Sequence, residues 1–263
     1  MPLPPDILEV FDREVRRQPG ILAPEYQRDF AGGVRRTVGP FPLAAHNWID
    51  FFESSNRSDI GAAIDEQVEF YDSIGYSFRW KIYSHDQSSD FEDVLLDRGF
   101  KPGEVCSLML LDAAEFPLNF PEDAEYRRLT DPDSLAEDLQ PICQRVWGDG
   151  TAEFVESLRA EMKGMGDSMR IYVADTDGTT AGCGLIRYTE GKKFGGLFAG
   201  ATVPEKRNRG IYRGMVSARV DDANQHGCPY LYTEASDMSR PILEYLGFEP
   251  AATLNNFVHE ATS

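Results

Sequence analysis

The sequence contains few of the residues that build metal sites and disulfide frameworks. Its 263 residues include only four cysteines and four histidines. None of these residues has the CxxC, HxxxH or HExxH spacing of common metal sites. We therefore expect no metal site, and we expect each cysteine to be a small buried side chain rather than half of a disulfide.

Long apolar runs are also missing. No segment approaches the roughly 18 consecutive apolar residues of a membrane-spanning helix. The first twenty residues carry prolines and charges where a secretory signal has an apolar core. We expect a cytoplasmic protein with no membrane partner.

Basic residues are the scarcer charge. The chain has 26 lysines and arginines against 44 acidic residues, which gives a net charge of −18. This balance argues against general binding to nucleic-acid phosphates, so no nucleic-acid partner is expected. An anionic ligand would need a local cluster of positive charge that overcomes the repulsion from the overall negative charge of the protein.

What the sequence does contain is an alternation of helical and strand periodicity, which predicts an α/β or α+β fold with mixed sheets flanked by helices. In the first part, this pattern predicts helices at 5–17, 59–71 and 91–96, and strands at 35–38, 47–52, 76–83 and 105–111. Segment 112–123 then has two prolines, four acids and no periodicity. We place a domain boundary there, with domains at 1–118 and 119–263.

The second part shows the same alternation. It predicts strands at 125–129, 170–174, 181–188, 196–203, 230–235 and 253–259, and helices at 134–146, 153–162, 209–225 and 240–246. Both parts end alike, because Gly99-Phe100 and Gly247-Phe248 each follow a short helix and open a strand. The matched order of elements favours a diverged internal duplication.

The most informative segment is the basic loop KRNR at 206–209, which follows a strand and precedes Gly210 and a long helix. A strand, tight turn and helix start of this kind brings several backbone N–H groups and the positive end of a helix dipole together, which suits a phosphate. It matches neither the P-loop nor the GxGxxG dinucleotide turn. The alternative is a solvated helix start in which Gly210 and Gly214 only permit close packing.

The string VPEKRNRGIYR at 203–213, followed by EAS at 234–236 and PILEYLGF at 241–248, resembles the GNAT superfamily of N-acetyltransferases. That superfamily has an [RQ]xxGx[GA] signature at the helix after its fourth strand, and a later helix that ends in Leu-Gly-Phe. The resemblance covers about residues 124–260. It implies a tandem arrangement in which the second half carries the coenzyme signature and the first half is a degenerate or partial unit of the same fold.

The resemblance implies acetyl-CoA as co-substrate, bound where the fourth and fifth strands of the second half separate. Residues implied in coenzyme binding are the strand end, the signature loop and a polar residue after the fifth strand: Ala201, Thr202, Val203, Arg207, Asn208, Arg209, Gly210, Ile211, Tyr212, Arg213 and Ser236. Tyr212 departs from the small residue that usually ends the signature.

Two further departures concern catalysis. The fourth strand of the second half, 197–203, has no carboxylate, and the usual acid position holds Leu243, with Tyr245 displaced by two residues. Glu234 is the best remaining base, and Tyr232 on the same strand face is the candidate acid. Structural roles for both residues, a strand-end cap for Glu234 and core packing for Tyr232, stay open.

The counterpart loop of the first half, 54–61, lacks the signature, so this half is not expected to bind coenzyme. Its aromatic residues could line an acceptor pocket or form ordinary sheet core: Trp48, Phe51, Phe52, Phe78 and Trp80. The activity expected is acetyl transfer from acetyl-CoA to a primary amine of a small molecule or peptide, and the acidity of the chain favours a cationic acceptor. The alternatives are a coenzyme-binding sensor or interaction protein without turnover, and transfer of a longer acyl group. Both a monomer and a homodimer remain open.

Overall fold

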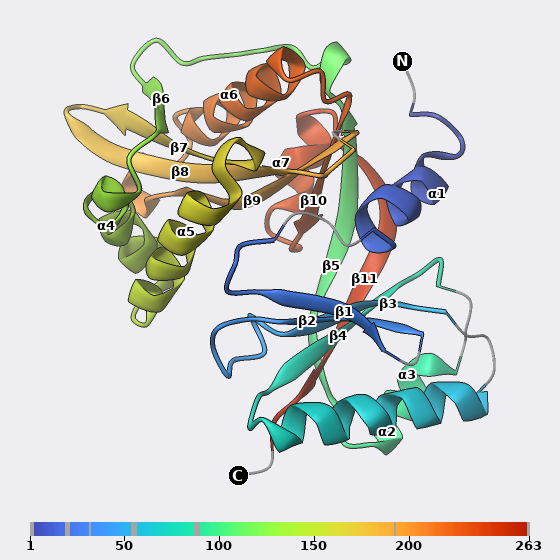
Figure 1. Cartoon of the computed structure of the whole chain (residues 1–263). Coiled ribbons are helices and arrows are strands. Elements are labelled where there is room, and N and C mark those ends of the chain that lie inside the picture. The colour runs from blue at the N-terminus through green and yellow to red at the C-terminus, as the bar shows by residue number, and fades with distance from the viewer. Residues whose placement is uncertain are drawn as a thin grey trace.

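The computed structural model describes residues 3–18, 22–31, 33–53, 57–86, 90–191 and 193–261. These residues form one eleven-stranded mixed sheet with helices packed against it (Figure 1). The strand order is β1-β2-β3-β4-β11-β5-β10-β9-β8-β7-β6. The mixed fold class predicted from the alternation of helical and strand patterns is confirmed.

The first part of the chain supplies one end of the sheet. Its elements are α1 (Ile7–Phe11), the π-helical turn η1 (Asp12–Arg16), β1 (Gln27–Ala31), β2 (Val34–Val38), β3 (Trp48–Phe52), α2 (Arg57–Ser73), β4 (Phe78–Tyr83), α3 (Phe91–Asp97) and β5 (Lys101–Asp112). Strand β1 was not predicted, because its sequence QRDFA is largely polar and has no apolar alternation.

The second part supplies the other end. Its elements are β6 (Glu125–Leu129), α4 (Leu135–Trp147), α5 (Thr151–Met165), β7 (Met169–Thr176), β8 (Thr179–Tyr188), β9 (Phe194–Thr202), α6 (Ile211–Gln225), β10 (Tyr230–Ala235), α7 (Arg240–Tyr245) and β11 (Glu249–His259). Four short 3-10 turns connect these elements. In the described ranges, no helix is both long and apolar enough to cross a membrane.

Strands β5 and β11 join the two parts of the sheet. They pair with each other in antiparallel fashion, and each also pairs with a strand of the other part: β5 with β10, and β11 with β4. In Figure 1 they run side by side through both ends of the molecule. Each part therefore receives one strand from the other, and the sheet continues across the predicted boundary at 118 and 119.

The two parts end with the same backbone geometry. Gly99 and Gly247, which are 148 residues apart (247 − 99), both have a left-handed φ, of 81° and 93°. The next residue donates to the leucine carbonyl five positions earlier in both cases, Phe100 to Leu95 and Phe248 to Leu243. This is the Schellman ending that glycine permits, and its repetition supports the inferred duplication.

Helices cover the two faces of the second half of the sheet. Side chains of α6 lie against Gly184 of β8 and Gly200 of β9, and Ile186 of β8 packs with Val216 and Val220 of α6. The intervening Leu185 packs in the cluster that holds the buried residues of α4 and α5. Because neighbouring strand residues point to opposite faces, α6 lies on one face and α4 with α5 on the other. The site described below uses both faces.

Candidate functional site

Strands β9 and β10 separate at their C-terminal ends. Their parallel pairing joins Tyr230–Tyr232 to Phe194–Gly196 and goes no further, and the Thr233 hydroxyl then donates to the Leu197 carbonyl at 2.8 Å. A bulge with φ of 49° at Ala199 deforms β9 at the same level. From this point β9 pairs only with β8, through Ala201 and Thr202. The strand ends implied in coenzyme binding therefore border an opening in the sheet.

The turn after β9 presents backbone N–H groups at the start of α6. Asn208 and Gly210 have left-handed φ values of 61° and 79°, which Gly210 adopts without side-chain strain. The first helical hydrogen bond of this turn runs from Gly214 to Gly210. The N–H groups of Ile211, Tyr212 and Arg213 thus lie in the first helical turn, where intrahelical acceptors are lacking, and Gly210 has no side chain to cap them.

The basic side chains of this loop are partly neutralised by acids. Arg209 pairs with Asp177 and Asp123, and Lys206 pairs with Asp177 at 2.7 Å. Arg207 donates to the Thr202 carbonyl at 3.2 Å. The charge of Arg209 is therefore compensated by acids, and an anion at this loop would meet backbone amides first.

Other residues singled out from the sequence lie near this opening. Ser236 follows β10 and shares a hydrogen bond with the Ser239 hydroxyl. Leu243 of α7 is buried in the core, and its apolar side chain has no proton to donate. Tyr245 is 77% exposed, and the guanidinium of Arg213 lies 5.4 Å from its ring centre.

A cavity of about 740 Å³ lies between the two parts of the molecule. Its walls come from β1 to β4 on one side, and from α5, β8, β9 and β10 on the other. Leu185 and Phe198 of the second part line it, so it lies on the face opposite α6. Glu234 and Tyr232, the predicted catalytic pair, both line this cavity.

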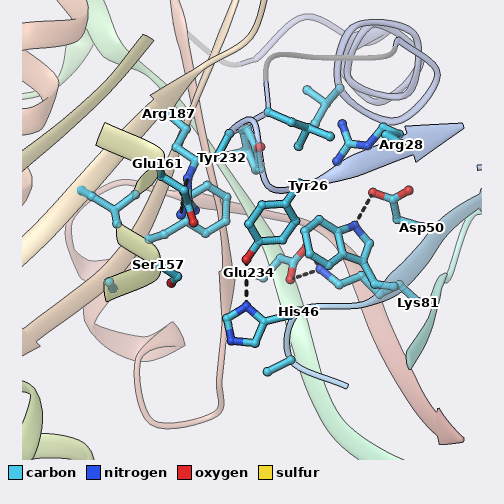
Figure 2. A pocket seen from close by; sticks show the side chains of 18 of the residues that line it. Tyr26, Arg28, His46, Asp50, Lys81, Ser157, Glu161, Arg187, Tyr232 and Glu234 are labelled. Carbon is cyan, nitrogen blue, oxygen red and sulfur yellow. Dashed lines mark hydrogen bonds and ion pairs between the residues drawn. The ribbon is translucent and has the colours of Figure 1, made fainter. Parts of the chain in front are cut away.

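Glu234 is held by two residues of β4, Lys81 and Tyr83, which lie 153 and 151 residues earlier in the chain. Figure 2 shows the contact with Lys81. Its carboxylate accepts hydrogen bonds from Lys81 Nζ at 2.7 and 2.8 Å and from the Tyr83 hydroxyl at 3.1 Å. Burial raises the pKa of Glu234, but the charge and hydrogen bonds of Lys81 outweigh it, so the net pKa is lowered. The carboxylate is therefore ionised and weakly basic at neutral pH.

Tyr232 lies where β9 and β10 diverge. Its ring covers Gly196, whose missing side chain leaves the necessary space, and packs edge-on against Phe11 and Phe198. Burial, assisted by the negative charge of Glu234, raises the pKa of Tyr232. The hydroxyl therefore keeps its proton at neutral pH.

A tyrosine–histidine pair that the sequence did not suggest lines the cavity. The Tyr26 hydroxyl and His46 Nδ1 are 2.8 Å apart, and Figure 2 marks their hydrogen bond with a dashed line. Burial lowers the pKa of His46, and the nearby positive charge of Arg79 lowers it further. The imidazole is therefore neutral at pH 7 and can accept a proton.

Buried ion pairs fix the remaining walls. Asp50 accepts two hydrogen bonds from Arg35 at 2.6 and 2.8 Å and one from the Trp48 indole at 3.2 Å. Although burial raises the pKa of Asp50, the Arg35 guanidinium brings it down to about 2. Arg187 of β8 pairs in the same way with Glu161 of α5 at 2.5 Å.

Of the five aromatic residues proposed as pocket or core, only Trp48 lines the cavity. Phe78, Trp80 and Phe51 are buried, and Phe52 packs against the core of the first half. Residues 54–56 of the counterpart loop lie outside the described residues. One available signal was missed: the alternation of Arg79, Lys81 and Tyr83 with apolar residues on β4, which places three polar groups on one strand face.

Metal-binding residues are not grouped in the described ranges, where no three His, Cys, Asp or Glu side chains lie together as a metal site requires. All four cysteines are free, and three of them are buried. The residues present thus offer proton-transfer groups, ion pairs and backbone donors.

Comparison with known proteins supports the architecture. No protein-family model and no curated protein matches the sequence. Among solved structures, the fold is similar to a GCN5-related N-acetyltransferase from Kribbella flavida, with a TM-score of 0.72, 11% identity, and coverage of 90% of this chain and 91% of that one. A tandem GNAT protein from the clavulanic acid biosynthesis pathway matches with a TM-score of 0.63 and 15% identity, over 99% of this chain and 89% of that one.

A GCN5-related N-acetyltransferase from Sphaerobacter thermophilus matches with a TM-score of 0.61 and 12% identity, over 88% of this chain and 82% of that one. The chain therefore has the tandem GNAT fold that the sequence motifs predicted.

Proposed function

We propose that this protein transfers an acetyl group from acetyl-CoA to a primary amine. The coenzyme enters between β9 and β10 from the face of α6, with its pyrophosphate on the N–H groups of 208–213. The amine binds in the cavity on the opposite face. The observation that carries the proposal is the opening between the two strands, which has an uncapped helix start on one side and a cavity with proton-transfer groups on the other.

The reaction needs a neutral amine and a proton for the departing sulfur. The amine nitrogen attacks the thioester carbonyl carbon, an N–C bond forms, the C–S bond breaks, and the amine loses one proton while the thiolate gains one. Tyr232 keeps its proton at neutral pH and lies at the divergence of the strands, so we assign it the role of acid.

Glu234 is assigned to hold the amine and to receive its proton. Its lowered pKa makes it a weak base, so much of the acceleration would come from fixing the amine beside the thioester. If Glu234 takes part, Glu234→Gln lowers kcat/KM by about tenfold. Unchanged turnover would show that this assignment is wrong.

A second candidate function is coenzyme binding without turnover. It is favoured by Leu243, which replaces the usual acid with a buried apolar side chain, and by the ion pair that occupies Glu234. Such a protein would act as a sensor or interaction module.

The two candidates are separated by measuring thiol release from acetyl-CoA across a panel of amines, together with acetyl-CoA binding by calorimetry. Tight binding with no thiol release would support the sensor. Under the transferase proposal, Tyr232→Phe lowers kcat roughly 10²-fold with little change in acetyl-CoA affinity. The matched control is Tyr230→Phe, because Tyr230 lies two residues before Tyr232 on the same strand.

A further inference from the structure

The cavity has a charge balance opposite to that of the whole chain. Its lining contains six cationic side chains and four carboxylates. The cations are Arg16, Arg28, Arg35, Arg79, Lys81 and Arg187, and the carboxylates are Glu14, Asp50, Glu161 and Glu234. The excess is two positive charges (6 − 4) in a protein with a net charge of −18.

Three of the lining carboxylates already have a cationic partner inside the cavity. Asp50 pairs with Arg35, Glu234 with Lys81 and Glu161 with Arg187. The fourth, Glu14, lies 3.4 Å from Arg13 and 3.6 Å from Lys193, which are outside the lining. The lining carboxylates are therefore engaged, which weakens the case for a strongly cationic ligand.

Arg79 is one of three lining cations outside these pairs, and the other two are Arg16, which pairs with Asp12 and Asp86, and Arg28. The one hydrogen bond of Arg79 to the described part of the chain runs from Nη2 to the Ala45 carbonyl at 2.8 Å, and its Nε is buried without a partner there. No described carboxylate lies within ion-pair distance of it. Its charge nevertheless acts inside the cavity, because it lowers the pKa values of both His46 and Glu234.

A second arginine adds positive charge on the wall formed by β1. Arg28 donates to the Thr37 hydroxyl at 2.9 Å. Burial lowers the pKa of Arg28 to about 10, Asp50 opposes this shift, and Arg35 adds to it. A guanidinium in such surroundings is stabilised by an additional negative charge.

We propose that the acceptor is a small amine that also carries an anionic group, a carboxylate or a phosphate, and that Arg79 binds that group. The inference rests on the proposed acetyl transfer and specifies its acceptor. Aromatic side chains between the charged walls, among them Tyr26, Trp48, Phe154 and Phe198, would contact an apolar spacer between the amine and the anion. The expectation of a cationic acceptor came from the charge of the whole chain, whereas binding depends on the local lining.

The test compares acceptors that differ only in the charge of one end. One series consists of benzylamines with a para carboxylate, phosphonate, carboxamide or second aminomethyl group. The other consists of 4-aminobutyrate, its amide and 1,4-diaminobutane. Thiol release gives kcat and KM for each, and quenching of tryptophan fluorescence gives binding without requiring turnover.

We expect the anionic members of a series to exceed their amides by roughly tenfold or more in kcat/KM, and the diamines to be poorest. Comparing carboxylate with phosphonate identifies the anion. In Arg79→Gln we expect this preference to disappear because the KM of the anionic acceptors rises. In Arg79→Lys we expect it to be partly retained. Arg98→Gln, which removes a half-buried arginine paired with Asp65 outside the cavity, leaves the preference intact.

Equal or better turnover of the amides or diamines would overturn the inference and leave acetyl transfer standing. Absence of all thiol release would overturn the transferase function, and the binding data would still decide the charge preference. If no anionic member binds more tightly than its amide, the inference is wrong.

Discussion

At the scale of single residues, the ion pair between Lys81 and Glu234 links the two parts of the molecule across the cavity. Neither side chain is more than about a quarter exposed, with values of 12% and 22%. Removing one member of such a pair leaves a largely desolvated charge without compensation, which costs more than the pair itself contributes.

We therefore expect Lys81→Met to lower the free energy of unfolding by about 3 kcal/mol at pH 7. The double substitution Lys81→Met with Glu234→Gln should recover much of this loss. Urea unfolding measures both. Lys101→Met serves as control, because Lys101 pairs with Glu260 on the open surface, and no measurable change is expected there.

The same pair predicts a pH dependence. The pKa of Glu234 is lower in the folded chain than in the unfolded chain, so the pair stabilises the fold above the unfolded pKa, near 4.3. This stabilisation is lost as pH falls through the folded pKa. Lys81→Met should therefore lose more stability at pH 7 than at pH 3, and equal losses at both pH values would contradict this account.

At the scale of elements, the turn into α6 depends on Gly210. Its φ of 79° is unfavourable for any residue with a side chain, and an added Cβ would lie 3.1 Å from Pro121. Gly210→Ala should shift the turn and rotate the N–H groups of 211–213 away from their common direction.

We expect Gly210→Ala to weaken acetyl-CoA binding by roughly tenfold, measured by calorimetry. Gly75→Ala is the matched control, since Gly75 has a φ of 71° in the first part of the chain and nothing within 4 Å of an added Cβ. It should carry a similar backbone strain without changing the affinity. Equal losses in both variants would show that strain alone, and not the amide geometry, is responsible.

The elements also show what the sequence could predict. Apolar periodicity located α2, α4, α5 and most strands to within a few residues. Helix α6 was located equally well although it does not bury one regular face, since residues 214–220 are all buried. The loop proposed to bind the coenzyme could be singled out because its residues are adjacent in sequence. The cavity could not, because its key contacts join residues far apart, such as Lys81 with Glu234 and Tyr26 with His46.

At the scale of the whole molecule, the exchange of β5 and β11 makes each part of the sheet depend on the other. Two parts with a similar order of elements could have been independent domains. Instead β5 lies between β11 and β10, and β11 lies between β4 and β5. Sequence periodicity predicted both strands but carried no information on their partners, because pairing across the sheet depends on the neighbours each strand meets after folding.

This arrangement predicts the behaviour of the separate parts. A chain of residues 119–263 would lack β4 and β5, so that β10 would expose an edge and β11 would lose both of its strand partners. Apolar side chains such as Leu231 and Leu254, both fully buried in the whole protein, would then be uncovered. We expect this chain to be insoluble or unfolded when expressed alone, and to gain a cooperative thermal transition when co-expressed with residues 1–118. Circular dichroism and size-exclusion chromatography follow both outcomes. A folded, monomeric 119–263 would show that the boundary at 118 and 119 separates two autonomous domains, and that the exchanged strands contribute little to the stability of either.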